Sequence, residues 1–178
     1  VDGAVRPGDE ALRAAGLAPV ELGLKDGLAI CNASSYSAGL AGLALQEAGE
    51  LIAAAQSAAA LSLTGFRATL TPFDPRMAVA RPHPGQARAA EELMRLLAGS
   101  GLDQPGAARR LQDPLSLRCI APIHGAVYAA LDFARDALMP ELNGAADNPL
   151  VLIEAGEILS NGNFQTPLLT VALDALSQ

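Results

Sequence analysis

The chain has 178 residues, 51% of them hydrophobic, so it is long enough to form one medium-sized domain with a hydrophobic core. Its formal net charge is −7, and Lys25 is its only lysine. Nucleic acids and anionic membrane surfaces are therefore excluded as expected partners, because both select clustered Lys and Arg side chains.

Helices dominate the first third of the chain. A turn at residues 6–9 leads into a helix that Gly16 ends, and a second short helix covers roughly Leu24 to Ile30. The Ala- and Leu-rich stretch from about Ser35 to Leu63 predicts one long helix. Small residues would let another helix approach it closely, which places it at the centre of a bundle. These residues are Gly39, Gly42, Gly49 and Ala53.

The middle of the chain alternates between loops and helices. Residues 71–84 contain four prolines and are predicted to be irregular, and a helix then runs from Pro84 to about Ala98. The Gly- and Asp-rich residues 99–106 form a predicted surface loop. Pro114 suits the first turn of a helix, because its missing N–H would have no partner there. One apolar helix is therefore predicted from Pro114 to about Leu142.

The last part of the chain predicts a small hairpin and a final helix. Residues 151–153 and 157–159 flank Ala155-Gly156 as two short strands, and Thr166-Pro167 starts the last helix. The predicted fold class is mainly α, a helical bundle with long central helices and one small β-hairpin. The chain begins at Val1 and stops within an amphipathic pattern, so residues 1–178 are interpreted as a single central helical segment of a larger chain.

The two cysteines predict neither a disulfide nor a metal site. Cys31 and Cys119 lie within predicted helices, and neither has a second Cys or a His at metal-ligand spacing. We interpret them as small buried thiols in a reducing compartment. No segment has the pattern of a signal peptide or a membrane-spanning helix, so a cytoplasmic protein is expected.

Four polar stretches interrupt the helical pattern, at residues 32–35, 112–118, 143–148 and 161–165. Loops at helix ends are where a helical scaffold can place catalytic groups, although each asparagine taken singly is better explained as a cap. Arg118 needs a carboxylate partner near the start of an apolar helix, and both a substrate carboxylate and an internal ion pair with Asp113 satisfy that need.

His83 lies between two prolines, and opening the next helix explains it better than a catalytic role does.

Five motifs occur in a fixed order along the chain: Gly27–Asn32, Arg81–Gln86, Gln112–Cys119, Ala146–Leu150 and Gly162–Gln165. In this order they resemble the aromatic amino-acid lyases, the family of histidine, phenylalanine and tyrosine ammonia-lyases and related aminomutases. The resemblance implies a mostly helical homo-oligomer, a tetramer whose active sites combine loops from several subunits. It also implies elimination of ammonia from an aromatic L-amino acid, a small-molecule substrate.

The resemblance assigns roles to single residues. Asn32 matches an asparagine that contacts the amino group and the prosthetic group, and Arg118 matches the arginine that pairs with the substrate carboxylate, where its two-pronged guanidinium fits. Gln112 and Phe164 match residues that line the pocket. Asn32 and Gln112 are therefore predicted to be catalytic, and Arg118 and Phe164 to bind substrate. His83, Asn163 and Gln165 are predicted to support the site around these residues.

The sequence departs from the family pattern at three places. Family members make an electrophilic methylidene-imidazolone from an internal Ala-Ser-Gly, and the nearest string here, Ala33-Ser34-Ser35, lacks the glycine whose amide closes the ring. Leu115 stands where the family has a tyrosine beside the reacting centre, and a leucine cannot move a proton. Ser35 replaces a glutamine found in many members. The resemblance also implies that this segment lacks the N-terminal part that makes the electrophile and the C-terminal helices. The methylidene-imidazolone is therefore expected only in a complete family member, with no cofactor in this chain and no lyase activity from it alone.

Three functional hypotheses remain open. The chain is a fragment of an ammonia-lyase, a non-catalytic relative that serves as a binding or assembly module, or one subunit of a two-chain lyase whose partner supplies the electrophile. Gln165 resembles the phenylalanine-type enzymes and Ser116–Cys119 the histidine type, so the sequence leaves the amino acid undecided.

Overall fold

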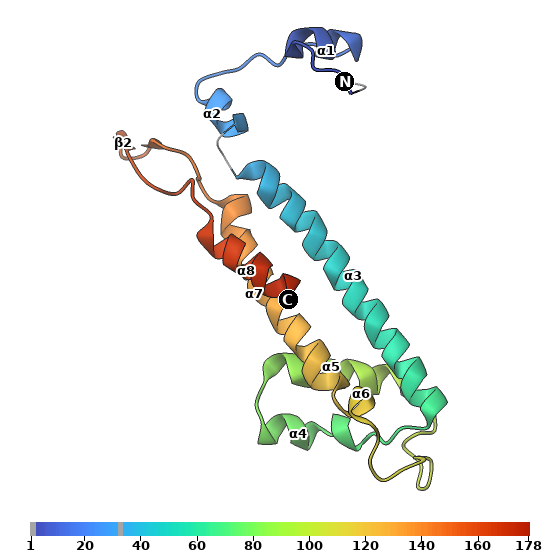
Figure 1. The fold of residues 1–178 in the computed structure, drawn as a ribbon. Coiled ribbons are helices and arrows are strands. Elements are labelled where there is room, and N and C mark those ends of the chain that lie inside the picture. The colour runs from blue at the N-terminus through green and yellow to red at the C-terminus, as the bar shows by residue number, and fades with distance from the viewer. Residues whose placement is uncertain (1–2, 32–33) are drawn as a thin grey trace. The chain divides into compact units, whose positions relative to one another are not determined.

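The structure is a computed structural model that describes residues 3–31 and 34–178. It confirms the mainly α fold with one small hairpin (Figure 1). Its elements are α1 (Gly8–Ala14), α2 (Asp26–Cys31), α3 (Ser35–Phe66), the 3-10 turn η1 (Thr71–Phe73), α4 (Pro75–Ala80), α5 (Pro84–Leu96), α6 (Leu115–Arg118), α7 (Ile120–Asn143), β1 (Leu150–Leu152), β2 (Glu157–Leu159) and α8 (Pro167–Ser177).

The chain forms two compact units. The first unit comprises Val1–Ala33 and Asp147–Phe164, and the second comprises Ser34–Ala146 and Gln165–Gln178. The first unit therefore holds α1, α2 and the hairpin, while the second holds the remaining helices.

In the first unit, α1 ends at a glycine as predicted. Gly16 has a φ of +72°, the left-handed conformation that commonly follows a helix. The hairpin pairs Leu150 with Leu159 and Leu152 with Glu157 in antiparallel register, and Gly156 in its turn also has a positive φ, of 66°. Lys25 ties this hairpin segment to the residues before α2, because its Nζ donates to the Pro149 carbonyl and pairs with Asp147 at 2.5 Å.

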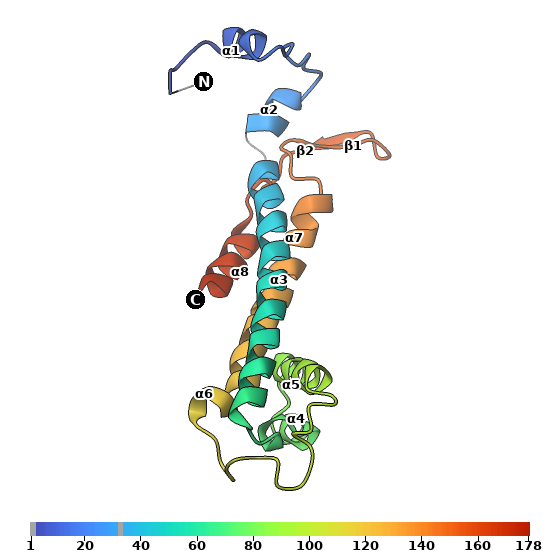
Figure 2. The same ribbon diagram turned by 90° about the vertical axis from the view of Figure 1, so that its right-hand side faces the viewer.

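The second unit is built on α3 and α7, which run side by side (Figures 1 and 2). α3 has one continuous buried face, while α5 and α8 both pack on α7. α3 ends in a left-handed residue, Arg67, after which the Ala68 N–H donates to the Leu63 carbonyl at 2.9 Å. The buried positions on α3 are Ala38, Ala41, Leu45, Ile52, Gln56, Ala60 and Leu63.

Glycines mark the places where helices approach one another closely. A Cβ added at Gly49 would meet Arg135 of α7, and one at Gly42 would make ordinary contact with Leu138, but one at Gly39 would meet nothing within 4 Å. The tightest approach joins α5 and α7, where a Cβ on Gly85 would lie 2.0 Å from the carbonyl oxygen of Gly125. The small-residue stripe on α3 thus faces α7 at Gly42 and Gly49, as expected of a helix inside a bundle, while the tightest backbone approach is made by α5 and α7.

Two helix boundaries also differ from the prediction. The single helix expected after Pro114 is divided into α6 and α7 at Cys119, whose φ of −94° and ψ of 6° interrupt the helical path. Residues 71–84, expected to be irregular, contain η1 and α4. α4 forms because the Asp74 side chain accepts the Arg76 N–H at 2.9 Å and Pro75 occupies the first helical position.

The two cysteines are less buried than predicted. Cys31 is exposed at the end of α2, and Cys119 is half-buried at the break between α6 and α7. Both positions lie at helix ends rather than in a helix interior.

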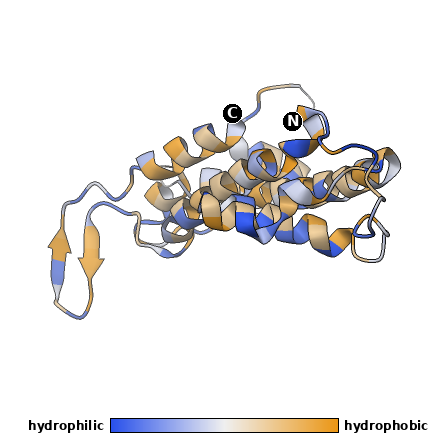
Figure 3. Cartoon of the chain, turned by 90° about the horizontal axis from the view of Figure 1, so that it is seen from below, coloured by the Kyte–Doolittle hydropathy of each residue, from blue (hydrophilic) through white to orange (hydrophobic). Residues whose placement is uncertain are grey.

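Many large apolar side chains of the second unit face outward. On α3, five exposed apolar residues recur near one side of the helix, opposite its buried face. These residues are Tyr36, Leu40, Leu43, Leu51 and Leu61. Figure 3, coloured by hydropathy, shows hydrophobic positions along all the long helices of the chain. Within the described ranges, no helix combines the length and the apolar character needed to cross a membrane.

Candidate functional site

A cavity of about 590 Å³ in the second unit is lined by the motif around Arg118. Gln112, Leu115 and Arg118 supply part of its wall, and Gln86 of α5 comes from a second predicted motif. Thr69, on the loop after α3, and Thr71, the first residue of η1, line it as well. Segments that lie far apart in sequence therefore meet at this cavity.

Arg118 occupies the last position of α6 and has a buried nitrogen without a partner. Its Nε is shielded from solvent and makes no hydrogen bond. No ion pair joins Arg118 to Asp113 or to any other described residue. The internal ion pair with Asp113 that the sequence left open is therefore not formed in the part of the chain that the structure describes.

Asp113 is instead bound to a backbone amide across the cavity loops. It is 4% exposed, and its Oδ2 accepts the N–H of Thr69 at 2.7 Å. Its other oxygen, Oδ1, is buried and has no hydrogen-bond partner. This contact joins two residues 44 positions apart, and nothing in the local sequence around Thr69 pointed to it.

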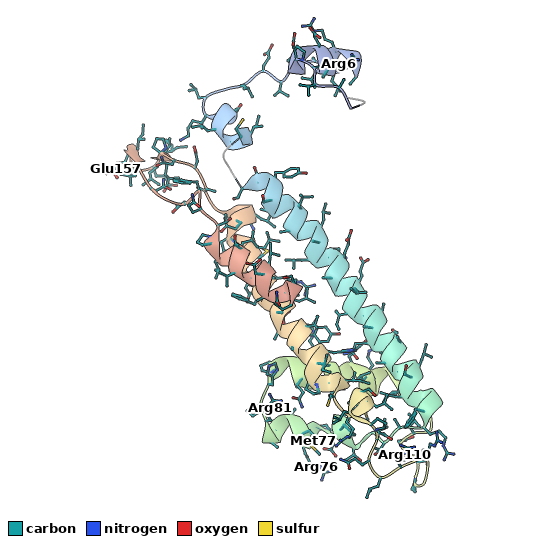
Figure 4. All side chains as sticks on the ribbon, viewed as in Figure 1. Arg6, Arg76, Met77, Arg81, Arg110 and Glu157 are labelled. Carbon is teal, nitrogen blue, oxygen red and sulfur yellow. The ribbon has the colours of Figure 1, made fainter. Side chains whose placement is uncertain are left out.

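The remaining cavity wall is a mixture of amide and apolar groups. Gln112 is exposed, and Leu115 lies on the wall with 65% of its surface accessible. Met77 of α4, labelled in Figure 4, also contributes to the lining. Sequence reasoning missed Thr69, Thr71 and Met77, because their place at the cavity depends on how α3 and α4 pack rather than on a local pattern.

His83 lies at a different cavity. It is the residue before α5, and its carbonyl accepts the N–H groups of Gln86 and Ala87, so it opens the helix as the sequence favoured. Its Nδ1 is buried without a partner, and it lines a cavity of about 370 Å³ with apolar neighbours such as Val79 and Ala87. His83 and Arg118 therefore do not share a site in this structure.

The other predicted site residues lie elsewhere. Asn163 and Phe164 belong to the first unit, and Phe164 is 40% exposed. Gln165 belongs to the second unit, as the first residue of its segment 165–178, and does not line the Arg118 cavity. Asn32 lies outside the described residues.

The asparagines between residues 147 and 163 hold their own loops together. Asn148 Oδ1 accepts the Asn161 N–H at 2.8 Å, and Asn161 Nδ2 donates to the Asp147 carbonyl at 3.0 Å. The Asn161 Oδ1 accepts the Asn163 N–H at 2.8 Å. The hydrogen bond from Lys25 lowers the pKa of Asp147 below its ordinary value of 3.8. These contacts match the capping role that the sequence favoured for single asparagines.

The chain does not fit the formation of a methylidene-imidazolone. Ser34 immediately precedes α3, where its carbonyl accepts the Ala38 N–H at 2.7 Å, and Ser35 is the first residue of the helix. The 178 residues contain no Ala-Ser-Gly tripeptide. No catalytic step through this group is therefore derived from these residues. Among the described residues, no three His, Cys, Asp or Glu side chains gather as metal ligands.

Comparisons with known proteins agree with the order of the motifs. Residues 1–178 match the sequence model described as "Aromatic amino acid lyase". The histidine ammonia-lyase of Anaeromyxobacter dehalogenans is 45% identical over 174 residues, which cover 96% of this chain and 34% of that protein. The histidine ammonia-lyase of Sorangium cellulosum is 42% identical over 179 residues, covering 97% and 35%. The chain thus spans about a third of the length of these relatives.

Solved structures show the same relationship. Ergothionase from Treponema denticola superposes with a TM-score of 0.82 at 32% identity, covering 95% of this chain and 34% of that one. The phenylalanine aminomutase of Pantoea agglomerans gives a TM-score of 0.80 at 31% identity, covering 94% and 36%.

Proposed function

The chain belongs to the aromatic amino acid lyase family, and from this we propose that it supplies the carboxylate-binding part of an active site that eliminates ammonia from an aromatic L-amino acid. The observation that carries the proposal is the buried, unpartnered Nε of Arg118 on the wall of the 590 Å³ cavity. A buried donor without a partner is unfavourable, and a bidentate carboxylate would satisfy it with charge-assisted hydrogen bonds.

The other residues have proposed roles around this contact. Arg118 holds the carboxylate, and the Gln112 amide can donate to the same ligand or accept from its amino group. Asn32 and Phe164 keep the roles that family resemblance gives them, beside the amine and the aromatic side chain. Active sites of this family combine loops from several subunits, so these residues need not act within one copy of the chain.

We propose that the chain alone does not complete the reaction. It lacks the Ala-Ser-Gly tripeptide, and Leu115 places an alkyl group on the cavity wall where the family has a phenol. In an assembly, another segment or subunit would supply the electrophile and the proton transfer. Leu115 also supports a second candidate, a non-catalytic relative that binds the amino acid or its product without turnover.

Self-association is the proposed means of covering the exposed apolar side of α3. The five side chains from Tyr36 to Leu61 form an unpartnered face along this helix, and homo-oligomer formation would bury it. Light scattering coupled to size-exclusion chromatography measures the mass in solution. A monomer at all concentrations would contradict this part of the proposal.

The binding proposal is tested by titrating the 178-residue chain with cinnamate, urocanate, L-Phe and L-His. Arg118→Met should abolish measurable carboxylate binding, and Arg118→Lys should retain only part of it, because an ammonium group lacks the two-pronged geometry. Arg95→Met is the matched control, since Arg95 is exposed on α5 and pairs with Glu92 instead. Equal affinity of the wild type and Arg118→Met for cinnamate would overturn the proposal.

Turnover is tested separately by following the absorbance of the conjugated acid with L-His, L-Phe and L-Tyr. The chain alone should give no product. Coexpression with an upstream-encoded polypeptide that contains Ala-Ser-Gly should restore turnover in a two-chain lyase. Absence of turnover from that pair, with both chains folded and carboxylate binding intact, favours the non-catalytic relative.

A further inference from the structure

Two loops of the Arg118 cavity are joined by a single side chain. Thr69 lies on the loop after α3, and Gln112 precedes α6; both residues line the cavity. Asp113, directly after Gln112, accepts the Thr69 N–H at 2.7 Å. The Asp113 side chain is therefore a bridge between segments that form the cavity wall.

The loop on the Thr69 side is well anchored. The preceding residue, Ala68, is fully buried and donates its N–H to Leu63 at the end of α3. The Arg67 carbonyl accepts the Arg109 N–H at 2.8 Å, which fixes a second chain segment to the same helix end. Asp113 thus bonds to a part of the backbone that α3 already holds in place.

The segment on the Asp113 side leads directly to Arg118. Pro114 is the residue before α6, and its carbonyl accepts the N–H groups of Leu117 at 3.0 Å and Arg118 at 3.1 Å. α6 has only four residues, so one turn of helix connects the anchored Asp113 backbone to the guanidinium-bearing residue. A displacement of Asp113 would consequently move both Gln112 and Arg118.

The burial of Asp113 is difficult to explain by stability alone. It is 4% exposed, its Oδ1 has no hydrogen-bond partner, and no described cation lies within ion-pairing distance. Burying a carboxyl group with half of its bonding capacity unused costs free energy. An apolar residue of similar size would avoid this cost but could not accept the Thr69 N–H.

We propose that Asp113 is a positioning residue of the carboxylate-binding cavity, which fixes Gln112 and Arg118 through its hydrogen bond to the Thr69 amide. This inference rests on the proposed function for the role of Arg118, but the placement of the loop is a separate physical claim. Asp113 itself does not touch the ligand. Its effect on binding passes through the neighbouring backbone and α6.

The first test compares a ligand that carries a carboxylate with the neutral amide of the same acid. Asp113→Ala should weaken cinnamate binding about tenfold, the size expected for loss of one hydrogen bond, and should leave the neutral amide cinnamamide nearly unaffected. Asp113→Asn retains an oxygen that can accept the Thr69 N–H and should bind cinnamate almost as the wild type does. Asp103→Ala is the matched control, because Asp103 is exposed on a neighbouring loop.

The second test needs no ligand. Cys119 lines the same cavity and is half-buried, so the rate at which a thiol reagent modifies it reports opening of the wall. The exposed Cys31 is first replaced by serine. Asp113→Ala should then speed modification of Cys119 several-fold, while Asp113→Asn and Asp103→Ala should not. Circular dichroism checks that each variant keeps its helices. If Asp113→Ala does not fold, Asp113→Ser is used in its place.

The outcomes separate this inference from the carboxylate proposal. Unchanged Cys119 reactivity in Asp113→Ala, or equal losses in the alanine and asparagine variants, would overturn the positioning role. Equal weakening of cinnamate and cinnamamide would do so too, because it indicates general damage to the cavity. An Arg118→Met variant that still binds cinnamate normally would refute the carboxylate function, while the thiol measurement would still decide whether Asp113 fixes the loop.

Discussion

Gly85 of α5 and Gly125 of α7 touch through their backbones. A Cβ on Gly85 would lie 2.0 Å from the Gly125 carbonyl oxygen, and a Cβ on Gly125 would lie 2.5 Å from the Gln86 nitrogen. Neither obstacle is the movable end of a side chain, so the two helices must separate to admit even one methyl group. The same crossing positions Gln86, which lines the Arg118 cavity.

Gly85→Ala is therefore expected to lower the free energy of unfolding by about 3 kcal/mol or more, the upper range for overpacking. Gly39→Ala on α3 is the matched control, since a Cβ there meets nothing within 4 Å. That substitution should stabilise the chain by about 0.5–1 kcal/mol, because alanine favours helix over glycine. Urea unfolding followed by circular dichroism measures both, and a smaller loss for Gly85→Ala than for a typical core substitution would contradict the tight crossing.

Gln56 should be replaceable by a residue of similar shape. It is fully buried on α3, donates to the Ala89 carbonyl at a long 3.4 Å and leaves its Oε1 without a partner. Gln56→Met removes the unsatisfied oxygen at nearly constant volume, so stability should stay within about 1 kcal/mol of the wild type or rise. Gln56→Ala should instead destabilise by about 2 kcal/mol or more, because it leaves a cavity. Thermal unfolding of the pair checks this order.

His124 should make stability depend on pH. Burial lowers its pKa below the ordinary 6.5, and its Nδ1 has no partner. The unfolded chain then binds more protons than the folded chain as pH falls through 6.5, so stability is highest above this pH and declines until the folded-state pKa is passed. His124→Gln should flatten the profile at pH values below 6.5, where the unfolded chain takes up a proton that the folded chain does not. Unfolding free energies of both proteins across that range provide the measurement, and an unchanged slope would rule out His124 as its source.

Lys25 should control the ionisation of Asp147. Lys25→Met removes the hydrogen bond that is the main cause of the low Asp147 pKa, so this pKa should rise toward 3.8. Because a depressed carboxyl pKa supports folding above its unfolded value, the variant should lose less stability than the wild type as pH falls below 3.8. Lys25→Arg, which keeps the charge, is the control. NMR titration of the Asp147 carboxyl carbon measures this pKa. An unchanged Asp147 pKa in Lys25→Met would show that Lys25 is not the cause of the low value.

Much of the fold could be predicted because local patterns determine local structure. The long helix from Ser35, the turn at Gly16, the hairpin around Gly156 and the helix at Pro84 all follow from propensity, caps and turn residues. The break at Cys119 was missed, although a local signal for it exists. Pro122 has no N–H to donate to the Arg118 carbonyl, and its ring disfavours a continuous helix at that point, so α6 and α7 are separate helices.

The site shows the same division. The order of five motifs indicated the family and named Gln112 and Arg118, which the structure brings to one cavity. The sequence alone could not choose between a ligand carboxylate and Asp113 as the partner of Arg118. Asp113 lies only five residues before Arg118, and either group could balance the charge of the guanidinium. The structure shows that Asp113 is not that partner, because its side chain accepts the Thr69 N–H instead.

The sequence by itself determined the helical class, the family and the absence of the Ala-Ser-Gly tripeptide, because each is written in consecutive residues or in their order. Tertiary structure alone decided that Gly85 meets Gly125, that Thr69 lies on the cavity wall, and that the Arg118 Nε is buried without a partner. These depend on the distances between segments that are far apart along the chain. Packing sets such distances, and no single segment encodes them.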